Sequence, residues 1–342
     1  MLAQTIQHYI LSCQQEDGAI LWFKGGKLDP WDHCEAAMAL SISGNYYAFR
    51  HAFEWLIENQ NKDGSWFAKY KSDENDDDLD REKIETNFVA YPACALWHYY
   101  LISQDKTYLQ RAFPTVMKAI DFVIQQQNSE GDIQWANSNA ETLPKDALVT
   151  ACASITRSLE CAINIANILE IDHDWEAPYH SLANCLTNKP WRFDRTWEPK
   201  TRFSMDWFYP ILSGIYQPEE ARIRIDERWN EFVHPEFGCR CVSDEPWVTV
   251  AESCELCLAL IASGRKKEAQ TIFKQLLHWQ DEDGGFWTGY SFRDEVIWPK
   301  EKTTWTAAAV LLVLDALENL TPASKLFTTP SALLFPPRDS ES

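Results

Sequence analysis

Two kinds of helical segment alternate along this chain, each with the 3.6-residue period of apolar and polar positions. One kind is rich in Ala, Cys and other small residues all round, as in ACALWHYYLIS at residues 93–103, which is typical of a helix packed on both sides. The other kind has one apolar face and one charged face. Strand patterns are weak, with few Val/Ile alternations and no Asn-Gly hairpin signal. The pattern therefore predicts an all-α protein.

We expect about six helices of each kind. The small-residue helices are expected at residues 33–43, 91–103, 145–169, 201–214, 248–263 and 302–320. The amphipathic helices are expected at residues 2–14, 46–60, 107–127, 175–186, 218–233 and 265–280. Six successive helical hairpins can close into a ring with the small-residue helices inside, which is an (α/α)6 toroid. We expect this toroid to be a single domain at residues 1–320, followed by a Pro- and Ser-rich tail at residues 321–342 that covers the surface or is disordered.

Four turns share one motif, in which a helix end is followed by Gln, an acidic or polar residue, Gly and Trp. The copies are QQEDGAILW (14–22), NQNKDGSW (59–66), QQNSEGDIQW (126–135) and WQDEDGGFW (279–287). A repeat of this kind indicates one supersecondary unit that is stacked several times. Each copy follows an expected outer helix. We therefore interpret it as a structural clasp, in which Gln and the backbone bridge helix ends while Trp fills the space between hairpins.

Two of these turns, Gln60-x3-Gly64-x-Trp66 and Gln280-x4-Gly285-x-Trp287, resemble the QW repeat of the squalene cyclase and prenyltransferase superfamily. The phrase DPWDHCEAAMAL at residues 29–40 is also similar to prenyltransferase-like chains. Residues 97–136 resemble instead the six-hairpin glycosidases, whose (α/α)6 barrel carries an aromatic, acid-lined cleft at the N-termini of its inner helices. Both resemblances imply an α/α toroid, but they imply different reactions.

The composition narrows the range of partners. A net charge of −20 over 342 residues argues against nucleic acids and anionic membrane surfaces. No uncharged run reaches membrane-spanning length, so we expect no stable membrane insertion. The N-terminus lacks the features of a signal peptide, and several of the ten Cys fall inside apolar helices, so we expect a cytoplasmic protein with reduced thiols. The sixteen Trp fit both wedges between helices and a surface for sugar rings or polyenes, and the oligomeric state stays open.

Acidic residues recur where the inner helices begin, and in a toroid these helix starts meet at one face. Asp32 and Glu35 have i, i+3 spacing on one face of the first inner helix, and Glu252 and Glu255 repeat this spacing in the fifth. Asp206 opens the fourth inner helix among aromatic residues. Paired carboxyls of this kind could act as general acid and base on a glycoside, or they could hold a carbocation. The structural alternative is that they complement the helix dipoles.

His33, beside Asp32, could orient that carboxyl or shuttle protons, although a lone His at a helix start also fits a structural role. The candidate catalytic residues are therefore Asp206, Glu252, Asp32, Glu255 and His33. The candidate substrate-binding residues share a place near the inner-helix starts; they are Trp31, Glu35, Glu85, Tyr91, Trp207, Tyr209, Trp247 and Trp305.

No metal or cofactor is expected. Asp32 and Cys34 form the Asp-x-Cys of zinc-binding protein prenyltransferases, but a matching later His is missing. The acidic run at residues 73–80 contains DDxxD as a string, yet a solvated loop or lid explains it as well, and metal binding there stays open. The sequence contains neither a phosphate loop nor a dinucleotide glycine pattern.

The function expected from these observations is that of an enzyme with an acidic, aromatic-lined central cavity, carbohydrate-active with glycoside hydrolase-like acid/base chemistry. Its partner would be a small-molecule glycan. The alternatives are a terpenoid cyclase or prenyltransferase-like enzyme acting on a polyprenyl substrate, and a non-catalytic binding scaffold. Two carboxyls across a polar groove would favour glycosides, whereas a closed aromatic pocket with one acid would favour polyenes.

Overall fold

The fold is known from a computed structural model that describes residues 2–70, 82–137 and 146–336. The acidic run at residues 73–80 lies outside the described residues. Within them, helices dominate and the strands are two or three residues long. The all-α class expected from the periodicity is confirmed.

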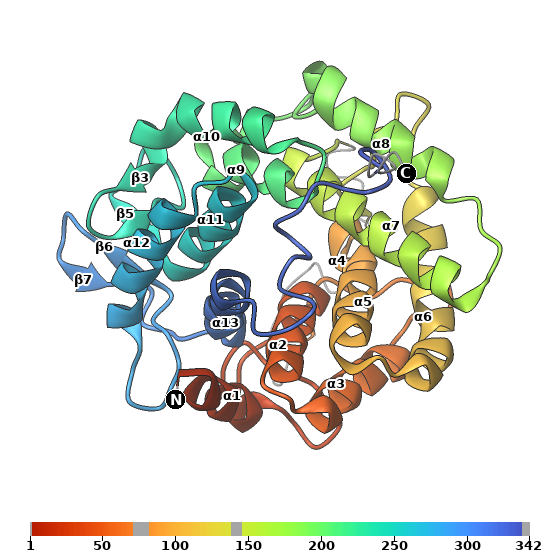
Figure 1. Cartoon of the computed structure of the whole chain (residues 1–342), viewed down its shortest axis with the longest axis horizontal. Helices are drawn as coiled ribbons and strands as arrows, with labels where there is room; N and C mark the ends of the chain where they lie inside the picture. The colour runs from red at the N-terminus through yellow and green to blue at the C-terminus, as the bar shows by residue number, and fades with distance from the viewer. Residues whose placement is uncertain (1, 71–81, 138–145, 337–342) are drawn as a thin grey trace, which may run out of the picture.

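Six inner helices form a closed ring, each packing against the next and the last against the first (Figure 1). Their many small buried side chains, such as Ala36, Ala37 and Ala39, let neighbouring backbones approach closely. The inner helices are α2 (Pro30–Ile42), α5 (Pro92–Ser103), α7 (Val149–Leu169), α9 (Ser204–Leu212), α11 (Val250–Ala262) and α13 (Thr304–Glu318). The short helix α4 (Thr86–Ala90) leads into α5.

Six outer helices surround this ring, so the (α/α)6 toroid is confirmed (Figure 1). They are α1 (Leu2–Cys13), α3 (Tyr46–Glu58), α6 (Lys106–Ile124), α8 (Glu176–Asn188), α10 (Pro218–Phe232) and α12 (Lys266–Leu276). The inner ring closes because α13 packs against α2, and the outer helix α1 also packs against α13. No helix in the described part of the chain combines the length and the apolar character needed to cross a membrane.

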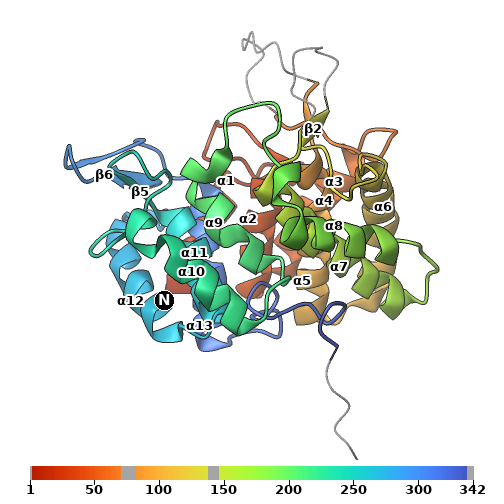
Figure 2. The same ribbon diagram turned by 90° about the horizontal axis from the view of Figure 1, so that it is seen from above.

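The inner helices all begin at the same end of the ring, which we call the mouth. Short antiparallel strand pairs lie in the connections there, with β2, β5 and β6 at one end of the molecule in Figure 2 and the C-terminal segment at the other. The strands are β1 (Ile84–Glu85), β2 (Ala136–Asn137), β3 (Val233–His234), β4 (Gly238–Cys239), β5 (Trp247–Thr249), β6 (Gly289–Ser291) and β7 (Val296–Ile297). They pair as β1 with β2, β3 with β4, and β5–β6–β7 as one sheet.

The four glutamine turns are clasps between successive hairpins, as the sequence predicts. In each turn the Gln amide donates one hydrogen bond to the carbonyl of its own turn's Gly and another to the next outer helix around the ring. The acceptors are Gly18 and Ala48 for Gln14, Gly64 and Thr115 for Gln60, Gly131 and Pro178 for Gln127, and Gly284 and the Thr5 hydroxyl for Gln280.

The glycine of each clasp is required by both conformation and space. Gly64 has φ +96°, and a Cβ there would lie 2.3 Å from the Lys118 carbonyl oxygen of α6. In the fourth turn the residue with positive φ is Gly284, not Gly285, and a Cβ on Gly284 would lie 2.3 Å from the Thr5 carbonyl oxygen of α1. The backbones of neighbouring hairpins therefore touch directly at these turns.

The side chain that fills the space between hairpins lies two residues after this glycine, and it is Trp in one turn only. Ile20, Trp66, Ile133 and Phe286 occupy that position, each 1% exposed or less. The expectation that Trp fills it in all four turns is therefore wrong for the other three. Trp287, one position further along the chain, is half-buried, with the Lys302 ammonium 5.0 Å from its ring centroid.

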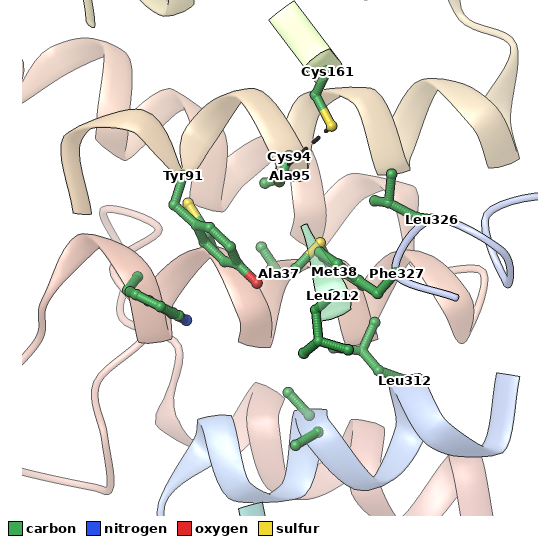
Figure 3. Packing of buried hydrophobic residues seen from close by; sticks show 14 of the residues in the cluster. Ala37, Met38, Tyr91, Cys94, Ala95, Cys161, Leu212, Leu312, Leu326 and Phe327 are labelled. Atoms are coloured by element: carbon green, nitrogen blue, oxygen red, sulfur yellow. Dashed lines mark hydrogen bonds between the residues drawn. The ribbon is translucent and has the colours of Figure 1, made fainter. Parts of the chain in front are cut away.

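The segment after α13 crosses the end of the ring opposite the mouth (Figure 1). Leu326 and Phe327 are buried there, and Figure 3 shows Phe327 beside Leu312 of the ring. Ser331 is also buried; it donates to Glu160 and accepts from Tyr179. The described part of the tail therefore lies across the ring as its floor, and its buried side chains pack against the ring.

Phe286→Ala is expected to reduce the free energy of unfolding by about 3–5 kcal/mol, because it removes a fully buried ring from the contact between hairpins. Trp287→Ala is expected to cost much less, since that ring is partly solvated. Urea unfolding of both variants at one pH measures the difference. An equal or larger loss for Trp287→Ala would contradict the assignment of the buried position.

Candidate active site

The N-terminal end of α2 carries three carboxyls near the mouth. Asp29 caps the helix by accepting from the Asp32 amide at 2.9 Å, with Pro30 in the first helical turn. Asp29 also accepts from the indole N–H of Trp22 at 2.7 Å, which ties the cap to the first clasp. Asp32 and Glu35 follow at i and i+3 spacing and share one helix face.

Glu35 lies one turn inside the ring and is 5% exposed. Its Oε1 accepts hydrogen bonds from the Trp31 indole at 3.0 Å and from the Tyr91 hydroxyl at 2.9 Å. Burial raises its pKa to about 7, because the two hydrogen bonds only partly offset the loss of water around the charge. Glu35 can therefore gain or lose a proton near neutral pH.

Asp32 remains partly exposed to solvent. Burial of its carboxyl raises its pKa well above the usual range, and the negative charges of Asp29 and Glu35 raise it further, as does a hydrogen bond with Asp29. Lys27 opposes this shift without cancelling it. Asp32 thus favours its protonated form more than an exposed carboxyl does, and the protonated form is the one that a general acid needs.

Two further carboxyls project from α11. Glu252 is 8% exposed in the first turn, and Glu255 is 7% exposed one turn deeper. Burial raises the pKa of Glu255 well above its usual range, and the charges of Glu35 and Glu252 add to the shift. Its Oε2 is buried without a hydrogen-bond partner among the described residues. The carboxyls of α2 and α11 therefore lie close enough to act on each other within the ring.

Aromatic side chains pack around this cluster. The Trp31 ring stacks on Tyr91 with centroids 4.9 Å apart, and it meets Tyr209 edge-on at 5.6 Å. Figure 3 shows the Tyr91 ring directed from its helix toward the middle of the ring. We call this set the central site; its residues are Trp31, Asp32, Glu35, Tyr91, Tyr209, Glu252 and Glu255.

His33 and Trp207 face away from the central site, contrary to the roles expected for them. His33 is fully buried; Nδ1 accepts from the Ile20 amide at 3.0 Å and Nε2 donates to the Ala52 carbonyl at 2.9 Å. Burial lowers its pKa to about 4, so the ring stays neutral and structural. Trp207 stacks on Phe232 of α10 and donates to a backbone carbonyl of that outer helix.

Other expected site residues lie nearer the rim of the mouth. Burial raises the pKa of Asp206 to about 6, but the charges that act on it are those of Asp194, Arg224 and Arg228, not the carboxyls of α2 or α11. Glu85 belongs to β1 and pairs with Lys83 at 2.8 Å. Trp247 belongs to β5, and the Trp305 indole N–H, at the start of α13, is buried with no partner in the described chain.

Two neighbours of the central site could not be singled out from the sequence. Asp29 has the pattern of a helix cap. Nothing in that pattern predicts that its carboxyl also hydrogen-bonds to the side chain of Asp32. Cys241 lies between β4 and β5, outside the helix that carries Glu252, so no helical spacing connects the two residues. Burial raises the pKa of the Cys241 thiol, and the charge of Glu252 and a hydrogen bond to its carboxyl raise it further. Across residues 2–70, 82–137 and 146–336, no group of three or more His, Cys, Asp or Glu side chains is arranged to hold a metal ion.

Comparison with known sequences places the chain among glycosidases. It is 43% identical over 325 residues to the MMP endo-(1,4)-3-O-methyl-alpha-D-mannosidase of Mycolicibacterium hassiacum, which covers 95% of this chain and 88% of that enzyme. It is 31% identical over 103 residues to the kojibiose hydrolase of Mucilaginibacter mallensis, a match of 27% of this chain and 15% of that protein. No protein-family model matches the chain.

Solved structures agree with this fold. A glycosidase variant in complex with glucose has a TM-score of 0.71 at 13% identity, covering 94% of this chain and 97% of that one. A GH63 mannosylglycerate hydrolase from Thermus thermophilus has a TM-score of 0.67 at 12% identity, covering 91% and 99%. The comparisons give no support to the terpenoid cyclase resemblance of the glutamine turns. Because the match to the mannosidase extends over nearly the whole chain, this glycoside hydrolase-like enzyme belongs to the family of the MMP endo-(1,4)-3-O-methyl-alpha-D-mannosidase.

Proposed function

We propose that this enzyme is an endo-acting α-mannosidase that hydrolyses internal (1→4) bonds between mannose or 3-O-methylmannose units. The observation that carries the proposal is the central site, where buried carboxyls of two inner helices meet beside stacked aromatic rings. The 43% identical mannosidase supports the choice of substrate. A neutral glycan also suits a chain of net charge −20, which would repel a polyanion.

Asp32 is the proposed general acid. Its carboxyl gives a proton to the glycosidic oxygen as the bond between that oxygen and C1 of the sugar breaks. Glu252 is the proposed general base, which takes a proton from the water whose oxygen forms the new bond to C1. Solvent then returns a proton to Asp32 and removes one from Glu252, so the enzyme ends the cycle unchanged.

The choice of Glu252 over Glu255 follows from depth and charge. Glu255 lies one turn deeper, and burial raises its pKa well above the usual range, with the charges of Glu35 and Glu252 adding to the shift. A carboxyl whose ionisation is disfavoured in this way is less suited to take a proton from water. Glu255 and Glu35 instead form the inner end of the site, where they can hydrogen-bond sugar hydroxyls, while the Trp31 ring offers an apolar face to the sugar.

Asp32→Asn and Glu252→Gln are each expected to lower kcat on an α-(1→4)-linked mannose oligosaccharide by about 10²–10⁴-fold, with Tm close to that of the unmodified protein. The measurement is reducing-sugar release. Asp226→Asn, an exposed carboxyl on outer helix α10, is the matched control and should retain activity. Wild-type rates in either active-site variant would overturn the assignment.

Inversion of configuration is expected, because the proposed acid and base stand on α2 and α11, two inner helices that α13 separates in the ring, and an acid and a base that act through a water invert the anomeric carbon. The first reducing end formed from an α-linked substrate should then be the β-anomer. Proton NMR of the product, recorded before mutarotation, distinguishes the outcomes. An initial α-anomer would mean that the second carboxyl attacks C1 directly.

Glu35→Gln is expected to change the dependence of stability on pH. Because folding raises the pKa of Glu35 from 4.5 to about 7, its contribution is fully present below pH 4.5 and is lost as the pH rises through 7. The variant keeps an acceptor for Trp31 and Tyr91 without the charge. It should therefore gain on the order of 1–3 kcal/mol relative to wild type between pH 4.5 and pH 8.

Urea unfolding at pH 4.5, 6 and 8 measures this gain. The same variant should also move the alkaline limb of the rate profile to lower pH, because the Glu35 charge helps to keep Asp32 protonated. A stability difference that does not vary with pH would contradict the buried, ionisable state of Glu35.

A further inference from the structure

A hollow of about 530 Å³ opens at the mouth between the starts of α9 and α11. Its size falls within the roughly 300–1,000 Å³ of small-molecule sites. Its walls come from the residues before α9, the connection from β4 to β5, and the β6–β7 hairpin, which stands at the mouth in Figure 2. Phe203, Trp247 and Trp298 are its aromatic lining.

The hollow is unusually apolar for an exposed surface. Nine large apolar side chains of the described residues are markedly exposed, and three of them line this one hollow. They are Trp298 at 56%, Val296 at 46% and Phe203 at 37% exposure. A concentration of this kind marks a binding surface rather than chance exposure.

The aromatic wall is held in place by its neighbours. The Trp247 indole donates to the Trp298 carbonyl at 2.7 Å, and the two rings meet edge-on with centroids 5.0 Å apart. A Cβ on Gly289 would lie 2.5 Å from the Trp247 indole nitrogen, so only glycine leaves room for this ring across β6. The polar side chains around the aromatic faces include Arg293, paired with Asp294 at 3.2 Å.

The hollow adjoins the proposed catalytic base. Cys241 lines it, and the thiol of Cys241 hydrogen-bonds to the Glu252 carboxyl. Trp247 begins the strand that runs directly into α11, where Glu252 lies in the first turn. A glycan chain bound across Glu252 would therefore pass into the hollow as it leaves the central site.

We propose that this hollow is a distal subsite that binds mannosyl units of the same glycan chain, beyond the bond that is cleaved. The proposal rests on the endo-mannosidase function proposed above. Pyranose rings expose C–H faces that stack on Trp and Phe, while their hydroxyls can reach Arg293 and Glu245 at the edges. An enzyme that cuts within a chain needs such a site, since several units must be bound outside the catalytic pair.

Trp298→Ala tests the proposal, because the exposed ring can be removed without opening the core. KM for a long α-(1→4)-linked mannose oligosaccharide should rise about tenfold, with kcat on the shortest cleaved oligosaccharide unchanged. Phe203→Ala, from the opposite wall, should act in the same direction, and Trp298→Phe should restore part of the affinity. Tyr47→Ala, which removes a 73% exposed ring from α3, is the control and should leave KM unchanged.

The outcomes separate the two proposals. If wild type cleaves the long oligosaccharide and Trp298→Ala shows the same KM, the distal subsite is wrong and the proposed function stands. If wild type neither cleaves α-mannosides nor binds the long oligosaccharide in calorimetry, both are wrong. A rise in KM that is equal for short and long chains would also overturn the subsite, because it would place Trp298 at the cleaved bond.

Discussion

One side-chain amide in each of four turns fixes the geometry on which the rest of the ring depends. Gln14, Gln60, Gln127 and Gln280 each join their own turn to the next outer helix. These turns lead into α2, α5, α7 and α13, so they set where those inner helices begin. The starts of α9 and α11 are built differently: two 3-10 turns, Pro190–Arg192 and Lys200–Arg202, precede α9, and the strands β3, β4 and β5 precede α11. The hollow at the mouth lies between these two connections. Where the clasp is absent, the rim has room for a ligand.

Forming the central site costs electrostatic free energy, because several carboxyls lose their contact with water. Glu35 and Glu255 are buried near each other, and no cation is among the causes that shift their pKa. Burying such carboxyls is tolerated when the neutral form is kept, which requires a raised pKa. A structural role would be served better by apolar side chains of similar size. Retaining several acids in one apolar ring is understandable when their protons are used in a reaction.

Helical periodicity was enough to predict the toroid, the order of inner and outer helices, and the acids at i, i+3 spacing. It could not predict which side of an inner helix faces the centre, because those helices are apolar all round. Trp207 and Tyr209 show the difficulty: two positions apart on α9, one packs against α10 and the other against Trp31. In the fourth turn the motif also indicated the wrong residue as the buried one, by one position, since Phe286 and not Trp287 is buried.

The closure of the ring has a consequence for synthesis of the chain. Helix α1 contacts α13, and the Tyr9 hydroxyl donates to the Lys302 carbonyl. The first outer helix therefore cannot make its contacts with the last inner helix until that helix has been synthesised. The floor beneath the ring comes later still, from Leu326 to Ser331. Contacts of such long sequence separation form slowly. A nascent chain therefore displays the carboxyls of α2 long before α11 can face them, and the central site is complete only after the residues of α13 and of the floor have left the ribosome.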